Sequence, residues 1–230
     1  MGVVWGSFLN VVIFRTTHGM SPMKGRSVCP KCKKQIDWKY NIPLLSFLFL
    51  RGKCHNCKKS ISWQYPVVEF VTGILFVWWF WVGSEFFRLA GQPWGLFQPI
   101  FWLIVGMLLL TIFVTDLLYG LIPDVVNLVL FSVVLMYRSS LVLSGKMDPV
   151  DLAKAVACAF ALTLFFAFLW WVTKKRGFGL GDVKMAPAIG LLLMWPKTLV
   201  AMMLAFIIGA LVGIVLLMVG KKRFGQTLPF

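Results

Sequence analysis

The sequence predicts an all-α polytopic membrane protein with about seven transmembrane helices and a small cytoplasmic zinc-binding domain. Of its 230 residues, 60% are hydrophobic and only 13% are charged, which is far more apolar than a soluble domain. Several apolar runs approach the roughly 20 residues that a helix needs to cross a bilayer. These runs are too long and too uniformly apolar for the alternating strands of an outer-membrane barrel.

Seven apolar segments supply the expected helices. Residues 1–14 are short and lack the basic start and small-residue cleavage site of a signal peptide, so we expect an incomplete first membrane helix. Residues 183–195 are also short, which predicts a tilted or partly buried helix. The remaining segments are long enough to span a membrane: residues 66–83, 97–115, 125–143, 153–173 and 198–219.

Basic residues gather in a few loops, and their distribution predicts the orientation. Eleven of the 23 Lys and Arg residues lie between Arg15 and Lys59, and further clusters occupy residues 174–176 and 221–223. Basic residues beside apolar segments mark cytoplasmic loops and can also meet anionic lipid headgroups. This places the N-terminus outside, and it explains the net charge of +15 without nucleic acid as a partner. Five basic residues fall outside the cytoplasmic set: Arg88, Arg138, Lys146, Lys154 and Lys197.

Four cysteines form two CxxC pairs, separated by 21 residues, within the first basic loop. Two such turns supply the four thiolates that a tetrahedral structural Zn²⁺ site requires. Redox-active or simply free thiols are the alternative, and a cytoplasmic location argues against stable disulfides. The expected ligands are Cys29, Cys32, Cys54 and Cys57. We therefore expect a short first helix at 1–14, a zinc-binding loop domain at 15–65 and a multi-helix transmembrane domain at 66–230.

The chain has only eight acidic residues, and most have an ordinary explanation. Glu85, Asp148 and Asp151 lie in external loops, and Asp37 lies among lysines in the cysteine loop. Glu69 is expected in the first turn of its helix, where a carboxylate complements the helix dipole, with a buried functional role as the alternative. The three that remain are Asp116, Asp124 and Asp182.

These three aspartates lie at the ends of apolar segments, where carboxylates suggest function. Asp124 follows a proline and precedes an apolar run, so a helix N-terminal role is its simple alternative. Asp116 closes a long span without an adjacent basic residue. Asp182 follows glycines at alternate positions, which allow close approach of another chain. This spacing is not a dinucleotide fingerprint, because no strand precedes it.

Two carboxylates that meet cannot both ionise cheaply, so the pKa of one of them rises. The ionised member can then activate water as a general base, while the protonated member donates to the scissile carbonyl. A membrane transporter or channel could use the same pair as an ion or proton relay. The residues by themselves leave these two hypotheses open.

The chain resembles the type IV prepilin peptidases, which are bifunctional leader peptidase/N-methyltransferases of pilus and type II secretion systems. The matching segments occur in order along nearly the whole chain. They are Gly6–Ile13, the two CxxC pairs, Asn41–Ser46, Arg51–Lys53, Tyr65–Glu69, the stretch from Asp116 to Asp124, and Gly179-x-Gly181-Asp182-Val183-Lys184.

The resemblance implies a GxGD-type aspartyl protease of the bacterial inner membrane, with Asp116 and Asp182 as the catalytic pair. Gly179, Gly181, Lys184 and Asp124 belong to the same motifs and would support that pair. Such enzymes cut the basic leader of prepilins and pseudopilins at the cytoplasmic membrane face. They then methylate the new N-terminal residue with S-adenosylmethionine, for which we expect a site near Gly52 and Lys53.

The sequence departs from the family pattern in two respects. Family members usually begin further upstream and continue past residue 230 into another apolar helix, so the resemblance implies a chain shortened at both ends. Leu118 stands where some members carry an additional acidic residue. Asp116 is therefore the single acidic candidate ahead of Pro123.

Overall fold

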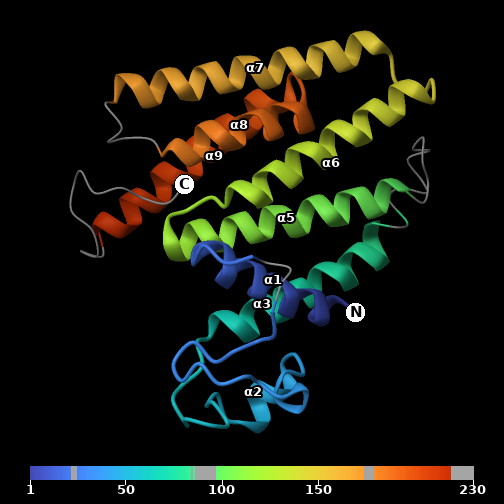
Figure 1. The fold of residues 1–230 in the computed structure, drawn as a ribbon. Helices are drawn as coiled ribbons and strands as arrows, with labels where there is room; N and C mark the ends of the chain where they lie inside the picture. The colour runs from blue at the N-terminus through green and yellow to red at the C-terminus, as the bar shows by residue number, and fades with distance from the viewer. Residues whose placement is uncertain (22–24, 84, 86–96, 174–178, 219–230) are drawn as a thin grey trace. The chain divides into compact units, whose positions relative to one another are not determined.

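The computed structural model describes residues 1–21, 25–83, 85, 97–173 and 179–218 (Figure 1). Within these residues the chain is helical and contains no strand, and each of the seven expected segments forms a helix. The helices are α1 (Gly2–Thr17), η1 (Trp38–Tyr40), α2 (Leu45–Phe49), α3 (Gln64–Trp78), η2 (Trp79–Gly83), α5 (Phe97–Tyr119), α6 (Asp124–Leu143), α7 (Pro149–Val172), α8 (Leu180–Leu193) and α9 (Lys197–Met218).

Five of these helices are long and apolar enough to cross a membrane, which confirms the predicted fold class. The two shortest of the seven segments, α1 with 16 residues and α8 with 14, fall below that length. The candidate spans are Gln64–Gly83, Phe97–Tyr119, Asp124–Leu143, Pro149–Val172 and Lys197–Val215. The basic clusters at 174–176 and 221–223 lie outside the described residues.

The chain divides into two compact units, Met1–Met107 and Leu108–Phe230. In the first unit, α1 packs along α3 through small residues. A Cβ on Gly6 would lie 2.6 Å from the Cα of Glu69, and a Cβ on Gly73 would lie 2.9 Å from the Val3 side chain. Glycines at both points therefore allow the two helix backbones to approach closely.

Residues 25–63, which we call the cysteine lobe, connect α1 to α3 in the first unit. The lobe holds the short helices η1 and α2 and two isolated β-bridges, Val28 with Gln35 and Lys53 with Ser60. Of its side chains, only Cys29 and Ser46 are buried. So little buried apolar surface cannot hold a fold of this size together without another source of stability.

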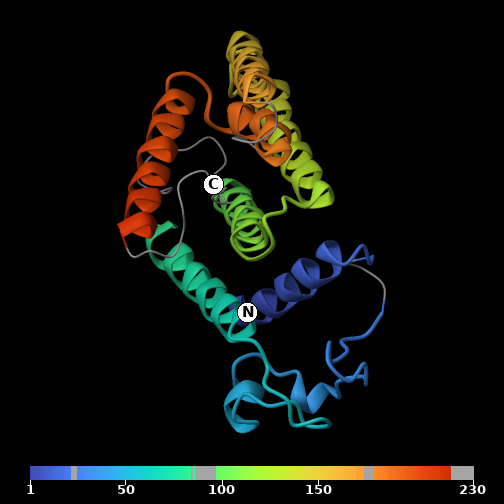
Figure 2. The same ribbon diagram turned by 90° about the vertical axis from the view of Figure 1, so that its left-hand side faces the viewer.

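In the second unit, α8 packs against both α6 and α7, which explains why a helix of 14 residues suffices there (Figures 1 and 2). Its buried residues are mostly small: Ala186, Ala188, Gly190, Leu191 and Leu192. A Cβ on Gly190 would lie 2.5 Å from the Cα of Ala159 in α7. The backbones of α7 and α8 are therefore nearly in contact at this point.

We expect the substitution Gly190→Ala to destabilise the second unit by about 1–3 kcal/mol, as overpacking of a tight interior usually does. The added methyl group would meet backbone atoms, which cannot turn away as a flexible side chain can. Gly106→Ala in α5 is the matched control, because a Cβ there meets nothing within 4 Å. Thermal unfolding in detergent should show a lower midpoint for Gly190→Ala and no loss for Gly106→Ala. Equal midpoints would contradict the close α7–α8 contact.

Candidate active site and metal centre

Asp116 lies in the last turn of α5, next to the point where that helix ends. Gly120 adopts a left-handed φ of +62° and donates its amide to the Asp116 carbonyl oxygen at 2.8 Å, as glycine commonly does at a helix C-terminus. The neighbouring Thr115 is fully buried and bonds its own helix through the Thr111 carbonyl. This end of α5 is thus fixed on one face, while the Asp116 side chain stays half-buried.

Asp182 lies in the first turn of α8 and not in the loop before it. The sequence predicted a helix from residue 183, whereas α8 begins at Leu180. The Gly179 amide donates to Asp182 Oδ2 at 3.2 Å, and the Asp182 amide faces the Gly179 carbonyl at 3.3 Å. This reciprocal arrangement resembles a capping box, which starts a helix earlier than the apolar pattern indicates. It also places a carboxylate at the positive end of the helix dipole.

The two predicted catalytic aspartates interact electrostatically. Asp182 lies outside the five candidate spans, and burial raises the pKa of its carboxyl above the ordinary aspartate value. The Gly179 amide opposes this shift, and the negative charge of Asp116 raises the pKa further. Two carboxyl groups whose charges interact titrate as a pair.

The raised pKa of Asp182 has a consequence for stability that can be measured. A carboxyl whose pKa is higher in the folded than in the unfolded protein stabilises the fold at low pH. That contribution is lost as the pH rises through the folded-state pKa. Asp182→Asn cannot ionise but keeps an acceptor oxygen for the Gly179 amide.

We therefore expect Asp182→Asn to unfold at a higher temperature than the wild type at pH 7. The difference should disappear below the ordinary aspartate pKa of about 4. Thermal unfolding in detergent at several pH values measures it, with the exposed Asp37→Asn as the control that should show no such trend. A lower midpoint for Asp182→Asn at pH 7 would contradict burial as the main cause of the shift.

Asp124 and Lys184 join α6 to the first turns of α8. Lys184 Nζ lies 2.7 Å from Asp124 Oδ1, and the Asp124 side chain is 71% exposed. Beside this ion pair, Asn127 donates from Nδ2 to the Lys184 carbonyl oxygen at 2.7 Å. Because an exposed ion pair contributes little stability, the bond from Asn127 is the firmer link. Asp124 differs from Asp116 and Asp182 in its exposure and in its cationic partner.

Gly181 lets the chain between α5 and α6 approach the start of α8. A Cβ at Gly181 would lie 3.0 Å from Ile122 Cδ1. A side chain at this position would push Ile122 away, and with it the connection between Asp116 and Asp124. The glycine therefore serves close packing beside the two carboxylates. Gly179 serves the helix start, through the amide that it donates to Asp182.

Arg138 is a residue that sequence analysis missed. It lies in α6, donates from Nη2 to the Leu192 carbonyl oxygen at 2.9 Å and contacts Met194 Sδ at 2.8 Å. A cation at the carboxyl end of α8 complements the helix dipole and supplies a partner for a carbonyl at the helix end. The signal in the sequence is a single arginine inside an apolar segment. For the orientation of the helices, Arg138 counted only as a basic residue outside the cytoplasmic set.

The four cysteines of the lobe come together as predicted. Their sulfur atoms all lie within 4.8 Å of one another, and none is in a disulfide. Four thiolates around Zn²⁺ at bonds of about 2.3 Å would be about 3.8 Å apart in a tetrahedron. Amide hydrogen bonds, first from Cys57, lower the pKa of the Cys54 thiol to about 7, whereas desolvation and the neighbouring cysteines raise the pKa of the Cys32 thiol to about 11. The set therefore fits a structural zinc ion, with no position left for a substrate.

The two CxxC turns repeat the same backbone geometry at an interval of 25 residues. Cys29 donates its amide to the Lys34 carbonyl, and Cys54 donates to that of Lys59, both at 2.9 Å. Lys33 and Lys58 follow the second cysteine of each turn with left-handed φ values of +59° and +57°. Lys31 joins the halves by donating to the Ser60 carbonyl oxygen at 2.6 Å. Each half thus presents its two sulfurs to one shared point.

Comparison with known proteins identifies the family. Residues 1–82 match the bacterial peptidase A24 N-terminal domain, and residues 103–214 match the type IV leader peptidase family. The prepilin leader peptidase/N-methyltransferase of Klebsiella pneumoniae is 36% identical over 212 residues, which cover 86% of this chain and 86% of that protein. The chain belongs to the type IV leader peptidase family.

Other relatives carry the same name. The protein from Bacillus subtilis is 32% identical over 231 residues, covering 100% of this chain and 86% of the relative. The protein from Neisseria gonorrhoeae is 31% identical over 261 residues, covering 100% of this chain and 83% of the relative. No solved structure gives a significant match. The resemblance drawn from the sequence motifs is confirmed, and membership of the family makes this chain a peptidase.

The predicted methyl-donor residues of this family member lie in the cysteine lobe. Gly52 has a left-handed φ of +67°, and a Cβ there would lie 3.1 Å from the Phe47 ring. Its amide bonds the Phe47 carbonyl at 2.8 Å, so Gly52 has a structural role in the turn before the second CxxC pair. Lys53 is exposed. A role of either residue in binding a methyl donor stays a prediction.

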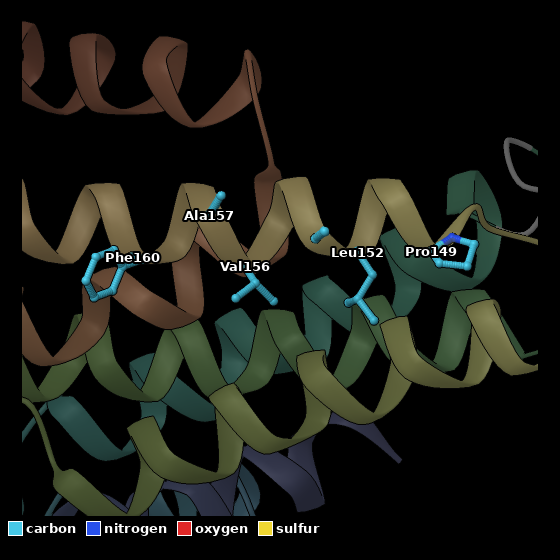
Figure 3. A pocket seen from close by; sticks show the side chains of 6 residues that line it. Pro149, Leu152, Val156, Ala157 and Phe160 are labelled. Carbon is cyan, nitrogen blue, oxygen red and sulfur yellow. The ribbon is translucent and has the colours of Figure 1, made fainter.

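A groove on α7 has no residue that could take part in peptide hydrolysis or methyl transfer. It is lined by Pro149, Leu152, Ala153, Val156, Ala157 and Phe160, all from α7 (Figure 3). Every lining residue is apolar, and the helix is a candidate membrane span. A groove of this kind offers no acid, base or donor to a reacting peptide. The carboxylates of the second unit therefore remain the candidate active site.

Proposed function

We propose that this protein cleaves the basic leader of type IV prepilins or pseudopilins, with Asp116 and Asp182 as its catalytic pair. The observation that carries the proposal is that the charge of Asp116, in the last turn of α5, acts on the carboxyl of Asp182, in the first turn of α8. Membership of the leader peptidase family supports it, as do the names of the relatives. Burial and mutual repulsion favour one protonated and one ionised carboxyl, as acid–base hydrolysis requires.

Hydrolysis then follows from ordinary carboxylate chemistry. The ionised aspartate takes a proton from water, and the water oxygen attacks the carbonyl carbon of the scissile peptide bond. The protonated aspartate donates to the carbonyl oxygen as the tetrahedral intermediate forms. When the intermediate collapses, the C–N bond breaks and the leaving amine accepts a proton from the pair. The two carboxyl groups titrate together, so the base of the first step is assigned to the pair and not to one aspartate.

The same protein would then methylate the amine that cleavage frees. The relatives are named N-methyltransferases, and S-adenosylmethionine would supply the methyl group. We place its binding site near Gly52 and Lys53, where the exposed lysine offers a cation to a carboxylate of the donor. The zinc ion would have a structural role in the same lobe, because four cysteine ligands leave no open position.

The charge distribution supports a cytoplasmic active site in the bacterial inner membrane. The loop from Arg15 to Lys59 carries eleven Lys and Arg residues beside candidate spans, and such loops remain in the cytoplasm. Asp116 and Asp182 fall on the same side when the helices alternate. Anionic lipid headgroups are the expected partners of the basic loop.

Incubation of the purified protein with a prepilin peptide tests both activities together. Mass measurement should show a product that lacks the leader. With S-adenosylmethionine present, the product should also gain the mass of one methylene. An intact peptide after long incubation with well-folded protein would count against the proposal. In that case, ion flux into proteoliposomes that depends on Asp182 would favour the transporter hypothesis.

A further inference from the structure

A buried polar cluster joins α1 to α3 in the first unit, and the proposed proteolysis does not use it. It consists of Ser7 and Asn10 on α1 and Glu69 on α3. Asn10 is 1% exposed and Glu69 is 7% exposed. Glu69 lies in the second turn of α3, which begins at Gln64, so the helix-dipole role expected from the sequence does not explain it. The structure supports the alternative, a buried carboxylate.

The contacts of the cluster leave hydrogen-bond acceptors unused. Glu69 Oε2 accepts from the Leu44 amide at 2.8 Å, and the Ser7 hydroxyl donates to the same carboxyl group. Asn10 donates from Nδ2 to the Tyr65 carbonyl at 3.0 Å, which fixes the orientation of its amide, while its buried Oδ1 has no partner. A carboxylate has about four acceptor positions, so Glu69 also has unused capacity.

The cluster lacks a positive charge. Among the described residues no lysine or arginine pairs with Glu69. A buried carboxylate without a cation is costly, and so is a buried amide oxygen without a donor. Tyr65 and Glu69 are one helical turn apart, and Asn10 bonds the first while Gly6 touches the second. Asn10 and Glu69 therefore both lie where α1 packs against α3.

We propose that Ser7, Asn10 and Glu69 form a binding site for a primary ammonium group, namely the new N-terminal amine of the cleaved substrate. A primary ammonium brings one positive charge and three N–H donors. Asn10 Oδ1 and the Glu69 carboxylate would accept hydrogen bonds from these N–H groups, and Glu69 would supply the negative charge that balances the ammonium. The assignment of the amine to a pilin rests on the proposed function, since an N-methyltransferase must hold its acceptor amine.

Leu44 donates its backbone amide to the Glu69 carboxylate and is held in an unfavourable conformation. Its φ of +59° is uncommon for a non-glycine residue and costs free energy. The hydrogen bond from its backbone amide to Glu69 fixes the segment that leads into α2. Phe47 of α2 contacts the Gly52 turn. Release of the Leu44 amide would open the carboxylate to a ligand. Because Leu44 leads into α2 and α2 contacts the Gly52 turn, a movement of Leu44 would also reach the turn where we place the methyl donor.

The test compares two peptides that differ only in charge at the N-terminus. One is a mature-sequence peptide that begins with a free phenylalanine amine, and the other is its N-acetylated twin. Binding of each to the full-length protein is measured without a methyl donor. We expect the wild type to bind the free amine about tenfold tighter or more, the worth of a buried charged hydrogen bond. Glu69→Gln keeps an acceptor for the Leu44 amide and should remove this preference without weakening binding of the acetylated peptide.

Controls separate this site from a structural role and from failure of the proposed function. Asp37→Asn removes an exposed acid from the same unit and should keep the preference for the free amine. If Glu69→Gln fails to fold, as judged by lost zinc, Asn10→Ala decides, because it leaves the Leu44 bond intact. A full preference for the free amine in the folded Glu69→Gln or Asn10→Ala protein would overturn the inference. Absence of prepilin cleavage by the wild type would instead count against the proposed function.

Discussion

Replacing either Asp116 or Asp182 with asparagine should abolish prepilin cleavage, with a loss of roughly 10²- to 10⁴-fold or more for each acid–base partner. Asparagine keeps the size of the side chain and one acceptor oxygen, but it cannot take or give the proton. Both variants should remain folded. The Gly179 amide at 3.2 Å can still find an acceptor at residue 182, and Asp116 has a half-buried side chain.

Asp124→Asn is the matched control for this experiment. Asp124 lies in the first turn of α6 and pairs with Lys184 of α8, but its side chain is 71% exposed. Loss of an exposed ion pair costs at most about 1 kcal/mol, so we expect a change in rate of no more than several fold. Cleavage is measured by mass spectrometry of a prepilin peptide under initial-rate conditions. Full activity of folded Asp116→Asn, or of folded Asp182→Asn, would exclude that residue from the catalytic pair.

The long helices could be predicted from the sequence because a bilayer imposes a simple requirement of length and apolarity. Each expected segment forms a helix, from α1 to α9. The start of α8 was harder to predict from the sequence, because Leu180 lies within a glycine-rich stretch. There the Gly179–Asp182 hydrogen bond, and not apolarity, decides where the helix begins. Such a bond depends on local geometry that hydropathy does not contain.

Contacts between distant segments could not be predicted from the pattern of residues. Glu69 bonds the amide of Leu44, 25 residues away, and Arg138 bonds the carbonyl of Leu192, 54 residues away. Both polar side chains occupy otherwise apolar segments, but the sequence alone assigned a partner to neither of them. Only the folded structure, in which α6 packs on α8 and the start of α2 meets α3, shows which partner it is.

The candidate metal site was predictable because its chemistry is local. A CxxC turn directs two sulfurs to one point, so the spacing of Cys29 with Cys32 and of Cys54 with Cys57 already defines each half. The repeated geometry of the two halves follows from matching left-handed residues, Lys33 and Lys58. Lysine gives no signal of that conformation in a sequence. The exchange of hydrogen bonds within each half explains why it is adopted.

Removal of zinc should unfold the cysteine lobe. A structural zinc site contributes roughly 10–16 kcal/mol in small zinc-binding peptides, which equals or exceeds the total stability of a typical domain, about 5–15 kcal/mol. The lobe has almost no buried apolar side chains of its own. We therefore expect about one zinc per chain in the purified protein, with a large loss of metal in Cys54→Ser.

Cys158→Ser is the control for zinc loss, because this fifth cysteine lies in α7 and outside the cluster. Hydrogen exchange should show lost protection of the lobe in Cys54→Ser and none in Cys158→Ser. Methyl transfer should fail together with the lobe, since the proposed donor site lies at the Gly52 turn and Leu44, which bonds Glu69 of the amine site, also belongs to the lobe. Cleavage should decline far less, because Asp116 and Asp182 belong to the other compact unit. Purified protein without metal but with disulfides between the CxxC cysteines would contradict the zinc site, because the thiols could not then act as ligands.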